Sequence, residues 1–546
     1  MPSLKAKKII REHVFELGTH ASFLVSRRLG LLSLGIGLVA LILFGKAFVL
    51  TVMQGRELTT RYDEIHSQFE WILAPRGLIT DATDQPLALN APGKKEHEFS
   101  RIYPQGEAFS CVLGFIGRID QSQLAQNASY LPYDLIGKTG IEAQYEQFLR
   151  GKDGSIEHPL TLQQEAVSNA PGMLINSPTP GNNVRLTLDS AMQKKLFEIV
   201  TNQVKKFNAP GGAAILMDPH TGAIKSLVSV PTYDNNDITV QLLNDPARPL
   251  FNRAVSAAYP PGSSIKPFLA ASALHEGVVT PSTIVHDRGK IEVPSSYDSR
   301  VVWTFHGWKA LGDVDMRKAI AQSSNVYFFT VGGGVGDIKG LGIEKIRHYL
   351  SLFGFSQKSG IDLGSENAGF LPSPQWKKDT LGEQWFIGDT YNSSIGQGFV
   401  QVTPLQLAVA TAALANNGTI YKPYLLDHIT DQQGKTVFLQ TPEAVRSNFL
   451  ASSELQVARE GMRQAVTAGT MWRLRDLPMP VAGKTGTAQA GAGKPYHGWV
   501  TIFFPYDKPE LVLTIFIENG EGGEQSAVPA AKEFLEWYID NAKFKN

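Results

Sequence analysis

Three short groups of residues in this sequence combine side chains that suit acyl transfer. The first is Ser263-Ser264-Ile265-Lys266, in which a hydroxyl and an amine lie three positions apart. If Ser263 begins a helix, Lys266 follows one turn later and both side chains share a face. A serine hydroxyl attacks once a base takes its proton, and a lysine is a base once burial lowers its pKa. The alternative is that Ser263 only caps that helix.

The second group is Ser323-Ser324-Asn325, which places a hydroxyl and an amide two positions apart. In a loop this spacing can direct both groups at one point, where the hydroxyl relays a proton and the amide holds a carbonyl or the lysine. Another match, Ser365-Glu366-Asn367, lies beside glycines that favour a surface turn. Because the apolar run VYFF follows Asn325, we expect the first match to be anchored in the core.

The third group, Lys484-Thr485-Gly486-Thr487, joins a cation and two hydroxyls with a residue that has no side chain. On a strand edge, Gly486 would let a substrate backbone approach closely. Thr485 and Thr487 can hold a carboxylate, and Lys484 supplies positive potential. Part of the pattern recurs at Lys138-Thr139-Gly140, which precedes the serine and leads into a helix. We interpret that copy as a structural turn.

The N-terminal region predicts a membrane anchor. Residues 29–53 are apolar except for Lys46, and about 20 apolar residues cross a bilayer. The preceding basic residues indicate that tail 1–28 stays in the cytoplasm and that the chain after Gly55 lies outside. A cleaved signal peptide is the alternative, but the run is long for one and no A-x-A site follows. Residues 54–65 read as a polar helix.

Composition sets further limits. Apolar residues make up 43% of the 546 residues and charged residues 19%, so the chain has enough apolar side chains for a sizeable core. Lys plus Arg equals Asp plus Glu, at 51 each, which argues against a general nucleic-acid binder. The one cysteine, Cys111, rules out a disulfide within the chain and a Cys-rich zinc site.

The order of predicted elements indicates two domains outside the membrane. The cluster SPTPGNN at 177–183 favours a boundary, giving domains 54–180 and 181–546. In the second domain we expect two strand pairs and a final helix: 213–217 with 223–229, 499–504 with 511–518, and 528–541. The strands flank a long helical middle. This pattern predicts an α+β fold, an antiparallel sheet covered by helices.

The three motifs, in this order, resemble the SxxK, Ser/Asn and KTG set of penicillin-recognising serine enzymes. Other stretches look like class B penicillin-binding proteins, and the resemblance covers nearly the whole chain: APRGLITD at 74–81, IGKTGIEAQYE at 136–146 and GQGFVQVTPLQ at 396–406. The residues before Ser263 look more like the elongation branch than the division-specific branch. The resemblance implies an extended pedestal domain and a transpeptidase domain that includes an all-helical subdomain.

The resemblance also implies a reaction, peptidoglycan D,D-transpeptidation that cross-links stem peptides. Lys266 would deprotonate Ser263, which attacks the carbonyl of a D-alanyl-D-alanine stem peptide. Backbone N–H groups of Ser263 and Thr487 would form the oxyanion hole. Ser323 would pass a proton to the departing D-alanine, and Asn325 would position the substrate amide and the lysine. An amine of a second strand would then take the acyl group.

The same resemblance implies the remaining partners. Lys484, Thr485, Gly486 and Thr487 would bind the substrate, with the lysine and both threonines at its terminal carboxylate. No cofactor is needed, β-lactams would be covalent inhibitors, and a polytopic SEDS-family glycosyltransferase would be a partner in the membrane. Some relatives bind zinc near the active site through a cysteine. This chain has no cysteine after Cys111, so we expect no such metal.

Some alternatives and one departure remain. A D,D-carboxypeptidase or a division-specific transpeptidase would use the same fold, and a membrane-bound β-lactam sensor would use the same site without turnover. A sensor needs a cytoplasmic effector, and residues 1–28 are too short for a folded one. Between Asn90 and Arg101 the family normally carries a longer insertion, which forms the head of the pedestal. Contacts that relatives make through that head are therefore in question here.

Overall fold

The computed structural model of the protein describes residues 31–54, 67–93, 99–126, 130–132, 134–159, 173–294, 300–491 and 493–541. Contacts within the chain divide it into two units. The first comprises residues 1–72 and 153–178, and the second comprises residues 73–152 and 179–546. Tail 1–28 and the predicted polar helix at 54–65 lie outside the described residues, apart from Gln54.

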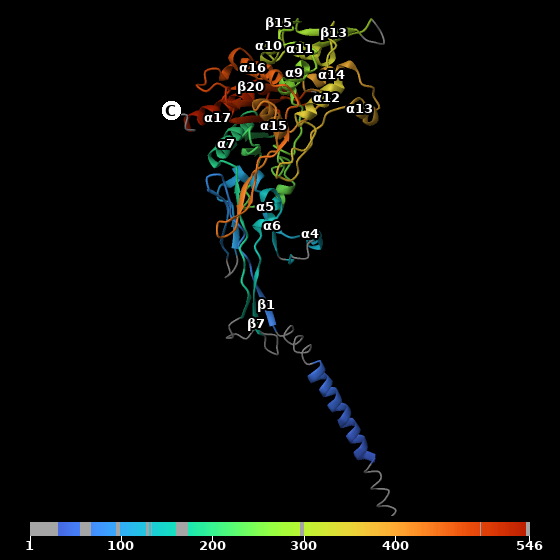
Figure 1. The fold of residues 1–546 in the computed structure, drawn as a ribbon, viewed down its shortest axis with the longest axis vertical. Coiled ribbons are helices and arrows are strands. Elements are labelled where there is room, and N and C mark those ends of the chain that lie inside the picture. Colours follow the sequence, from blue (N-terminus) through green and yellow to red (C-terminus); the bar gives the residue numbers. More distant parts are fainter. Residues whose placement is uncertain are drawn as a thin grey trace, which may run out of the picture. The chain divides into compact units, whose positions relative to one another are not determined.

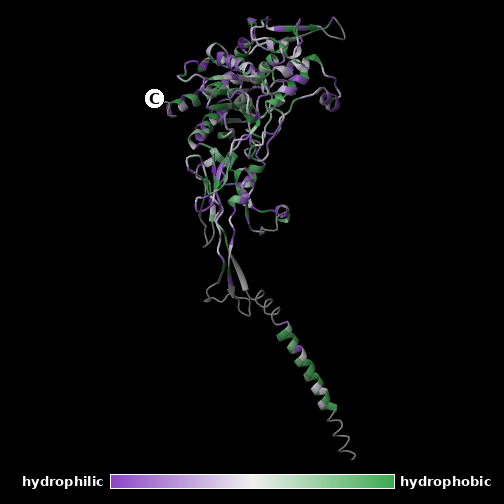
Figure 2. Cartoon of the chain, viewed as in Figure 1, coloured by the Kyte–Doolittle hydropathy of each residue, from purple (hydrophilic) through white to green (hydrophobic). Residues whose placement is uncertain are grey.

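The first unit contains a long apolar helix, Leu31–Met53, inside the predicted segment 29–53. It ends in the π-helical turn η1 (Val49–Met53), and Figure 2 shows it as mainly hydrophobic. Its 23 residues span roughly 35 Å, enough to cross a bilayer core. Among the described residues it is the one helix long and apolar enough to do so. The unit also holds a three-stranded antiparallel sheet in the order β1 (Ser67–Ile72), β7 (Gly154–Pro159), β8 (Met173–Asn176).

One end of the second unit is a six-stranded sheet assembled from distant parts of the chain. Its order is β18 (Thr436–Leu439), β17 (Leu426–Thr430), β9 (Asn183–Leu186), β2 (Ile79–Thr80), β3 (Pro86–Pro92), β4 (Phe99–Ile102). Strands β2 and β9 run parallel, and the other neighbours are antiparallel. These strands come from both sides of residue 180, and the division into domains there stays a prediction.

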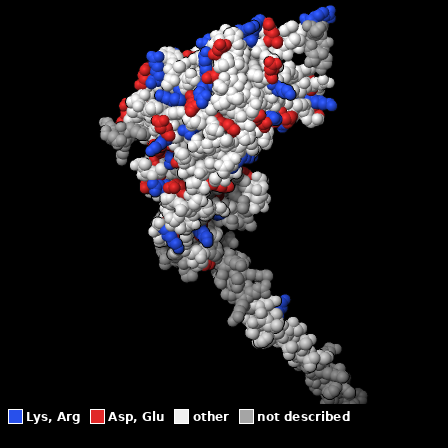
Figure 3. Space-filling model, turned by 45° about the horizontal axis from the view of Figure 1, so that its top comes forward, with Lys and Arg blue, Asp and Glu red and all other residues white. Residues whose placement is uncertain are grey.

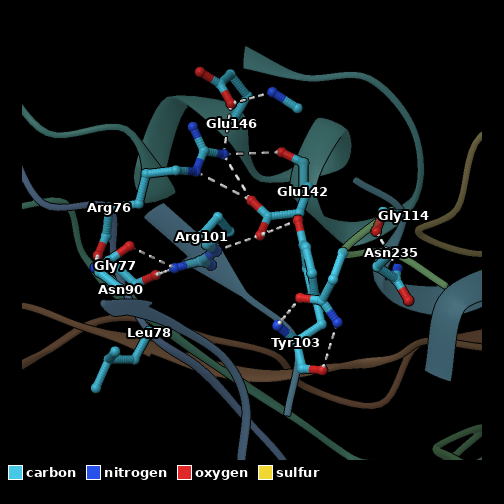
Figure 4. A network of polar contacts seen from close by, with 12 residues as sticks. Arg76, Gly77, Leu78, Asn90, Arg101, Tyr103, Gly114, Glu142, Glu146 and Asn235 are labelled. Carbon is cyan, nitrogen blue, oxygen red and sulfur yellow. Dashed lines mark hydrogen bonds and ion pairs between the residues drawn. The ribbon is translucent and has the colours of Figure 1, made fainter. Parts of the chain in front are cut away.

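Short elements complete this end: α3 (Ser110–Leu113), β5 (Ile116–Arg118), α4 (Gln121–Gln126), β6 (Leu135–Gly137), α5 (Gly140–Gln144) and α6 (Glu146–Leu149). A buried ion network ties α5 and α6 to the sheet region (Figure 4). Glu142 accepts from Arg76 at 2.8 Å and from Arg101 at 2.7 Å, and Glu146 accepts from Arg76 at 2.7 Å. Two of the stretches that resemble class B proteins, APRGLITD and IGKTGIEAQYE, therefore meet in one cluster of charges.

The network is matched in charge, which allows its burial. Glu142 is fully buried, and Arg101 also donates to the carbonyl of Gly77 at 2.9 Å. Burial alone would raise the pKa of Glu142, but Arg101 and Arg76 hold it below its usual value. A buried charge is tolerated when it is paired and hydrogen-bonded in this way.

The other end of the second unit is built on a five-stranded antiparallel sheet. Its order is β11 (Ile224–Val230), β10 (Gly212–Met217), β22 (Leu511–Ile517), β21 (Tyr496–Phe504), β20 (Ala482–Gln489). Both predicted strand pairs are confirmed. Strand β20 lies at an edge of the sheet, which leaves one side of the strand for a ligand.

Helices cover both faces of this sheet, as the alternation of side chains along a strand requires. On β10, Ala214 and Leu216 pack with α7 (Ser190–Lys206) and α17 (Val528–Asn541), whereas Ala213 and Ile215 point to the other face. There they pack with α15 (Pro404–Ala415), in which every residue is buried. Asp189 caps α7 by accepting from the N–H of Met192.

The predicted helical middle forms a cluster beside the sheet, where Figure 1 shows these helices gathered around β20. Its helices are α9 (Lys266–His275), α10 (Met316–Ala321), α11 (Asn325–Gly333), α12 (Gly342–Leu352), α13 (Pro374–Leu381), α14 (Ile387–Ser394) and α16 (Ser452–Ala468). Three small strand pairs accompany them: β12 (Val285–Asp287) with β15 (Gly312–Val314), β13 (Lys290–Pro294) with β14 (Val302–His306), and β16 (Ile420–Tyr421) with β19 (Ala444–Arg446). The short helix α8 (Val240–Leu243) follows β11 in the chain, and β5 pairs with β6 at the other end of the unit. The predicted α+β class is confirmed.

Candidate active site

Ser263 lies in a tight turn, η3 (Gly262–Ile265), that leads directly into α9. Gly262 has a φ of 55°, which a glycine adopts without strain. A Cβ at this position would lie 2.4 Å from the carbonyl oxygen of Thr487 on β20. The glycine therefore allows the turn to pack against the edge strand, so the first and third motifs adjoin. Ser263 is partly exposed, whereas Lys266 is fully buried.

Lys266 reaches from α9 to the second motif. Its Nζ donates to Asn325 Oδ1 at 2.7 Å, to the carbonyl oxygen of Ser323 at 2.9 Å and to Ser323 Oγ at 3.3 Å. Among the described residues these are the hydrogen-bond partners of Nζ, and Ser263 Oγ is not one of them. Catalytic hydrogen bonds are often long before a substrate arrives, so this geometry does not exclude the serine–lysine pair.

The electrostatic environment of Lys266 favours a neutral amine. Burial lowers its pKa well below the usual value, and the nearby Lys484 lowers it further. Asp287 acts in the opposite direction. A lysine of lowered pKa is able to accept a proton from a hydroxyl near neutral pH.

The second motif lies between two helices. Ser323 follows α10 with a φ of 56°, and Asn325 is the first residue of α11. A non-glycine residue in this left-handed region is uncommon and is held in place by its surroundings. Ser324 Oγ accepts from the N–H of Tyr327 and so caps α11. The same hydroxyl donates to Asp287 Oδ2 at 2.6 Å.

The third motif lies on β20. Lys484 is fully buried, and its Nζ donates to the carbonyl oxygen of Thr485 at 3.0 Å. Burial lowers the pKa of Lys484 to about 7. Thr487 is exposed at the edge, where its hydroxyl accepts from the N–H of Gly523 at 3.2 Å. Thr487 is thus accessible at the edge of the strand, whereas Lys484 is enclosed by the protein.

Gly486 makes room for a neighbouring segment of the chain. A Cβ there would lie 2.5 Å from the carbonyl oxygen of Pro261 and 2.9 Å from Cβ of Trp499. The segment that precedes Ser263 therefore approaches β20 closely at this glycine. The predicted approach of a substrate backbone at Gly486 stays a prediction.

The two alternative matches lie elsewhere. Thr139 is the N-cap residue of α5, which agrees with the predicted structural turn at Lys138-Thr139-Gly140. That turn and Ser365-Glu366-Asn367 both line a cavity of about 870 Å³, together with Cys111. Neither match contributes to the cluster around Lys266.

Sequence analysis missed Asp287, the buried carboxylate beside the second motif. Its local pattern, Asp287-Arg288-Gly289, predicts only a turn, and Gly289 N–H does donate to Asp287 Oδ1 at 2.8 Å. The packing that buries this turn comes from residues distant in the sequence, so no local signal could have shown it.

The motif order and the meeting of the three motifs beside β20 place the chain in the class of penicillin-recognising serine enzymes, which share this signature set. The family described as Penicillin binding protein transpeptidase domain matches residues 212–536. The family described as Penicillin-binding Protein dimerisation domain matches residues 92–186.

Curated relatives agree. The chain is 33% identical over 480 residues to the peptidoglycan D,D-transpeptidase MrdA of Haemophilus influenzae, covering 81% of this chain and 70% of the relative. It is 36% identical over 481 residues to the MrdA of Acinetobacter baumannii, covering 83% and 68%. The chain therefore belongs to the class B penicillin-binding proteins.

Solved structures give the same fold. The structure of Pseudomonas aeruginosa PBP2 in complex with WCK 5153 aligns with a TM-score of 0.73 at 30% identity, covering 88% of this chain and all of that one. The Helicobacter pylori complex between PBP2 and MreC aligns with a TM-score of 0.72 at 26% identity, covering 87% and 99%.

Proposed function

We propose that this chain is the peptidoglycan D,D-transpeptidase of cell elongation, and that Ser263 is its nucleophile. The similarity to MrdA proteins over most of the chain supports the reaction and its setting. The single observation that carries the site assignment is the set of hydrogen bonds from the buried Lys266 Nζ to Ser323 and Asn325. These bonds join the first two motifs into one site next to the edge strand.

The roles of the residues follow from this arrangement. Lys266, whose pKa is lowered by burial, takes the proton of Ser263 as the hydroxyl attacks the carbonyl between the two D-alanines of a stem peptide. The C–N bond breaks, and Ser323 Oγ relays this proton from Lys266 to the departing D-alanine. The amine of a second stem peptide then attacks the ester, forms the cross-link and returns a proton to Ser263 as the ester bond breaks. Asn325 holds Lys266 and the substrate amide.

The edge strand orients the substrate in this scheme. Thr487 and Thr485 hold the terminal carboxylate by their hydroxyls, and Gly486 keeps β20 close to the turn that carries Ser263. Lys484 is buried behind these threonines and supplies positive potential when it is protonated. No step of this acyl transfer calls for a cofactor.

The partners of the chain are proposed from the relatives. One related structure is a peptidoglycan synthase complex, aligned with a TM-score of 0.72 at 26% identity, and described as coordinating polymerization and crosslinking. We extend this to a polytopic SEDS-family glycosyltransferase that contacts the helix Leu31–Met53 in the membrane. The orientation follows from the basic N-terminal tail: residues 1–28 lie in the cytoplasm, and the chain after Gly55 lies outside.

Labelling with a fluorescent penicillin tests the site. The full-length protein in detergent should become covalently labelled, and intact mass with peptide mapping should place the adduct on Ser263. Ser263→Ala should abolish labelling. Ser365→Ala, in the second Ser/Asn match, is the control and should label like the wild type. Persistent labelling of Ser263→Ala would assign the nucleophile to another serine.

A further inference from the structure

Asp287 is a buried charge that the reaction scheme above does not use. It ends β12, it is 1% exposed, and among the described residues it forms no ion pair. Its hydrogen-bond donors are Ser324 Oγ at 2.6 Å and the N–H of Gly289 at 2.8 Å. Burying a carboxylate without a paired cation is costly, and such a group needs an explanation.

Asp287 and Trp308, which lie about 20 residues apart in the chain, contact the residues on either side of Ser323. Trp308 Nε1 donates to the carbonyl oxygen of Gln322 at 3.1 Å, directly before Ser323. Asp287 accepts from Ser324, directly after it. A backbone hydrogen bond joins the two ends of this stretch, because Leu311 N–H donates to the carbonyl oxygen of Asp287 at 3.0 Å.

Ser323 therefore keeps its left-handed backbone between two anchored neighbours. That conformation directs both its carbonyl oxygen and its hydroxyl at Lys266 Nζ. Left-handed backbone is unfavourable for a non-glycine residue, so the contacts on either side must maintain it.

Charge gives Asp287 a second effect on the same amine. Within the described residues, the charged groups that act on Lys266 are Lys484 from β20 and Asp287 from β12. The lysines repel each other, and Asp287 offsets part of that repulsion. Its carboxylate thus acts on the fully buried amine of Lys266, while its hydrogen bond to Ser324 holds the loop that contacts this amine.

We propose that Asp287 is a positioning residue for acyl transfer, which fixes the Ser323–Asn325 turn through Ser324 and supplies a negative charge that offsets the effect of Lys484 on Lys266. The inference rests on the proposed function, because it takes Lys266 as the base of Ser263. Asp287 touches neither substrate nor nucleophile in this scheme. It acts through the hydroxyl of Ser324 and through its charge.

The charge and the hydrogen bond of Asp287 can be removed separately, and the two variants should behave differently. Asp287→Asn keeps a hydrogen-bond acceptor for Ser324 but removes the charge. Without that charge Lys266 loses its proton more easily, so the acid side of the rate–pH profile should move down by roughly one pH unit. Ser324→Ala keeps the charge and breaks the link. Its acylation rate should fall roughly ten- to hundredfold at every pH, with the midpoint unchanged.

The experiment measures second-order acylation of the full-length protein in detergent by a fluorescent penicillin, from about pH 5 to about pH 9. The matched control is Asp362→Asn. Asp362 is a partly buried carboxylate that accepts from the hydroxyl of Tyr145 and the N–H of Leu425, and it lies outside the cluster. This variant should have a lower melting temperature, but its rate–pH profile should match that of the wild type. The double variant Asp287→Asn with Ser324→Ala should lose less than the two single losses combined.

The outcomes separate the two proposals. An unmoved midpoint in Asp287→Asn, with Ser324→Ala equally impaired, would mean that Asp287 has a structural role only and would overturn the inference. If Asp287→Asn does not fold, Ser324→Ala decides: full activity at every pH would also overturn it. A wild type that fails to label at all would instead refute the proposed function.

Discussion

Two fully buried lysines lie in one site, and their surroundings assign them different tasks. Lys266 donates to groups of the second motif, whereas Lys484 donates to the carbonyl and hydroxyl of Thr485 on its own strand. In the proposed mechanism the first therefore takes the proton of the nucleophile, and the second supports the strand proposed to bind the carboxylate. This difference can be tested with ligands that differ only in charge.

Replacement of each lysine by alanine should give distinct losses. Lys266→Ala removes the base, so acylation by a carboxylated β-lactam and by its methyl ester should both fall roughly 10²–10⁴-fold. Lys484→Ala removes positive potential, so the carboxylated ligand should lose more than the ester. Lys138→Ala, in the other Lys-Thr-Gly copy, is the control and should change neither rate. Equal losses for both lysine variants on both ligands would contradict the division of roles.

The pH dependence of acylation by a carboxylated β-lactam should reflect the protonation of Lys484. Because burial lowers its pKa to about 7, Lys484 is positively charged below that pH and neutral above it. Second-order acylation by a carboxylated β-lactam should therefore decline as pH rises through about 7, and acylation by the methyl ester should not. Rates measured with both ligands on wild type and Lys484→Ala check this. If acylation of Lys484→Ala by the carboxylated ligand still declined as pH rises, the decline would be due to another group.

At this scale the sequence could predict which residues come together but not how they are supported. Ser263, Lys266, Ser323 and Asn325 were recognisable because their types and spacing match those of an acyl-transfer site. Asp287 was not, because its position beside Ser324 depends on the packing of β12 against α11. For Gly486 the sequence did not show that the residue makes room for Pro261, because that contact joins distant parts of the chain.

Among the elements, the ion network around Glu142 holds two helices to a sheet region. Its carboxylate bonds to Arg76 and Arg101, and the hydroxyl of Tyr103 donates to it at 3.3 Å. The pKa of Glu142 is depressed, so this stabilisation is present above its unfolded pKa of about 4.3 and is lost as pH falls below it.

Glu142→Gln should destabilise the protein by roughly 3–5 kcal/mol, because it leaves two buried arginines short of negative charge. Thermal unfolding of the full chain in detergent at neutral pH measures the effect. Lys532→Gln is the control, since Lys532 and Glu536 form a surface pair with both side chains exposed. Such pairs contribute about 0–1 kcal/mol. Equal melting temperatures for the two variants would show that the buried network does not stabilise the fold.

Elements with strong local signals were predictable. The helix Val528–Asn541 and the hairpin β10–β11 follow from apolar periodicity and from turn residues. The six-stranded sheet was not, because β2 and β17 are short and lie far apart in the chain. Such strands gain their stability from neighbours and carry little pattern of their own.

At the scale of the whole molecule, charges of both signs are interspersed over the visible face (Figure 3). The equal totals of basic and acidic residues agree with this surface. The long apolar helix is the feature that places the chain, since it is able to cross a membrane. What remains to be measured is which side of the membrane carries the site.

Protease added to intact spheroplasts should degrade the bulk of the chain, since the basic tail predicts that residues after the helix lie outside. A tag fused to residue 1 should stay protected until the membrane is permeabilised. A cytoplasmic marker protein, intact throughout, serves as the control. Protection of the bulk of the chain in sealed cells would reverse the orientation and remove the proposed access to cell-wall peptides.

The sheet that joins β9 to both β2 and β17 also sets an order of events during synthesis. Strand β9 is able to pair with β2 once both have been made, but its other neighbour, β17, follows about 240 residues later. At roughly 5–20 residues per second, that interval lasts on the order of ten to fifty seconds. Throughout it, one edge of β9 has no strand to pair with and is open to contacts with other chains. The growing polypeptide therefore carries a half-built sheet, completed only when most of the catalytic part has been synthesised.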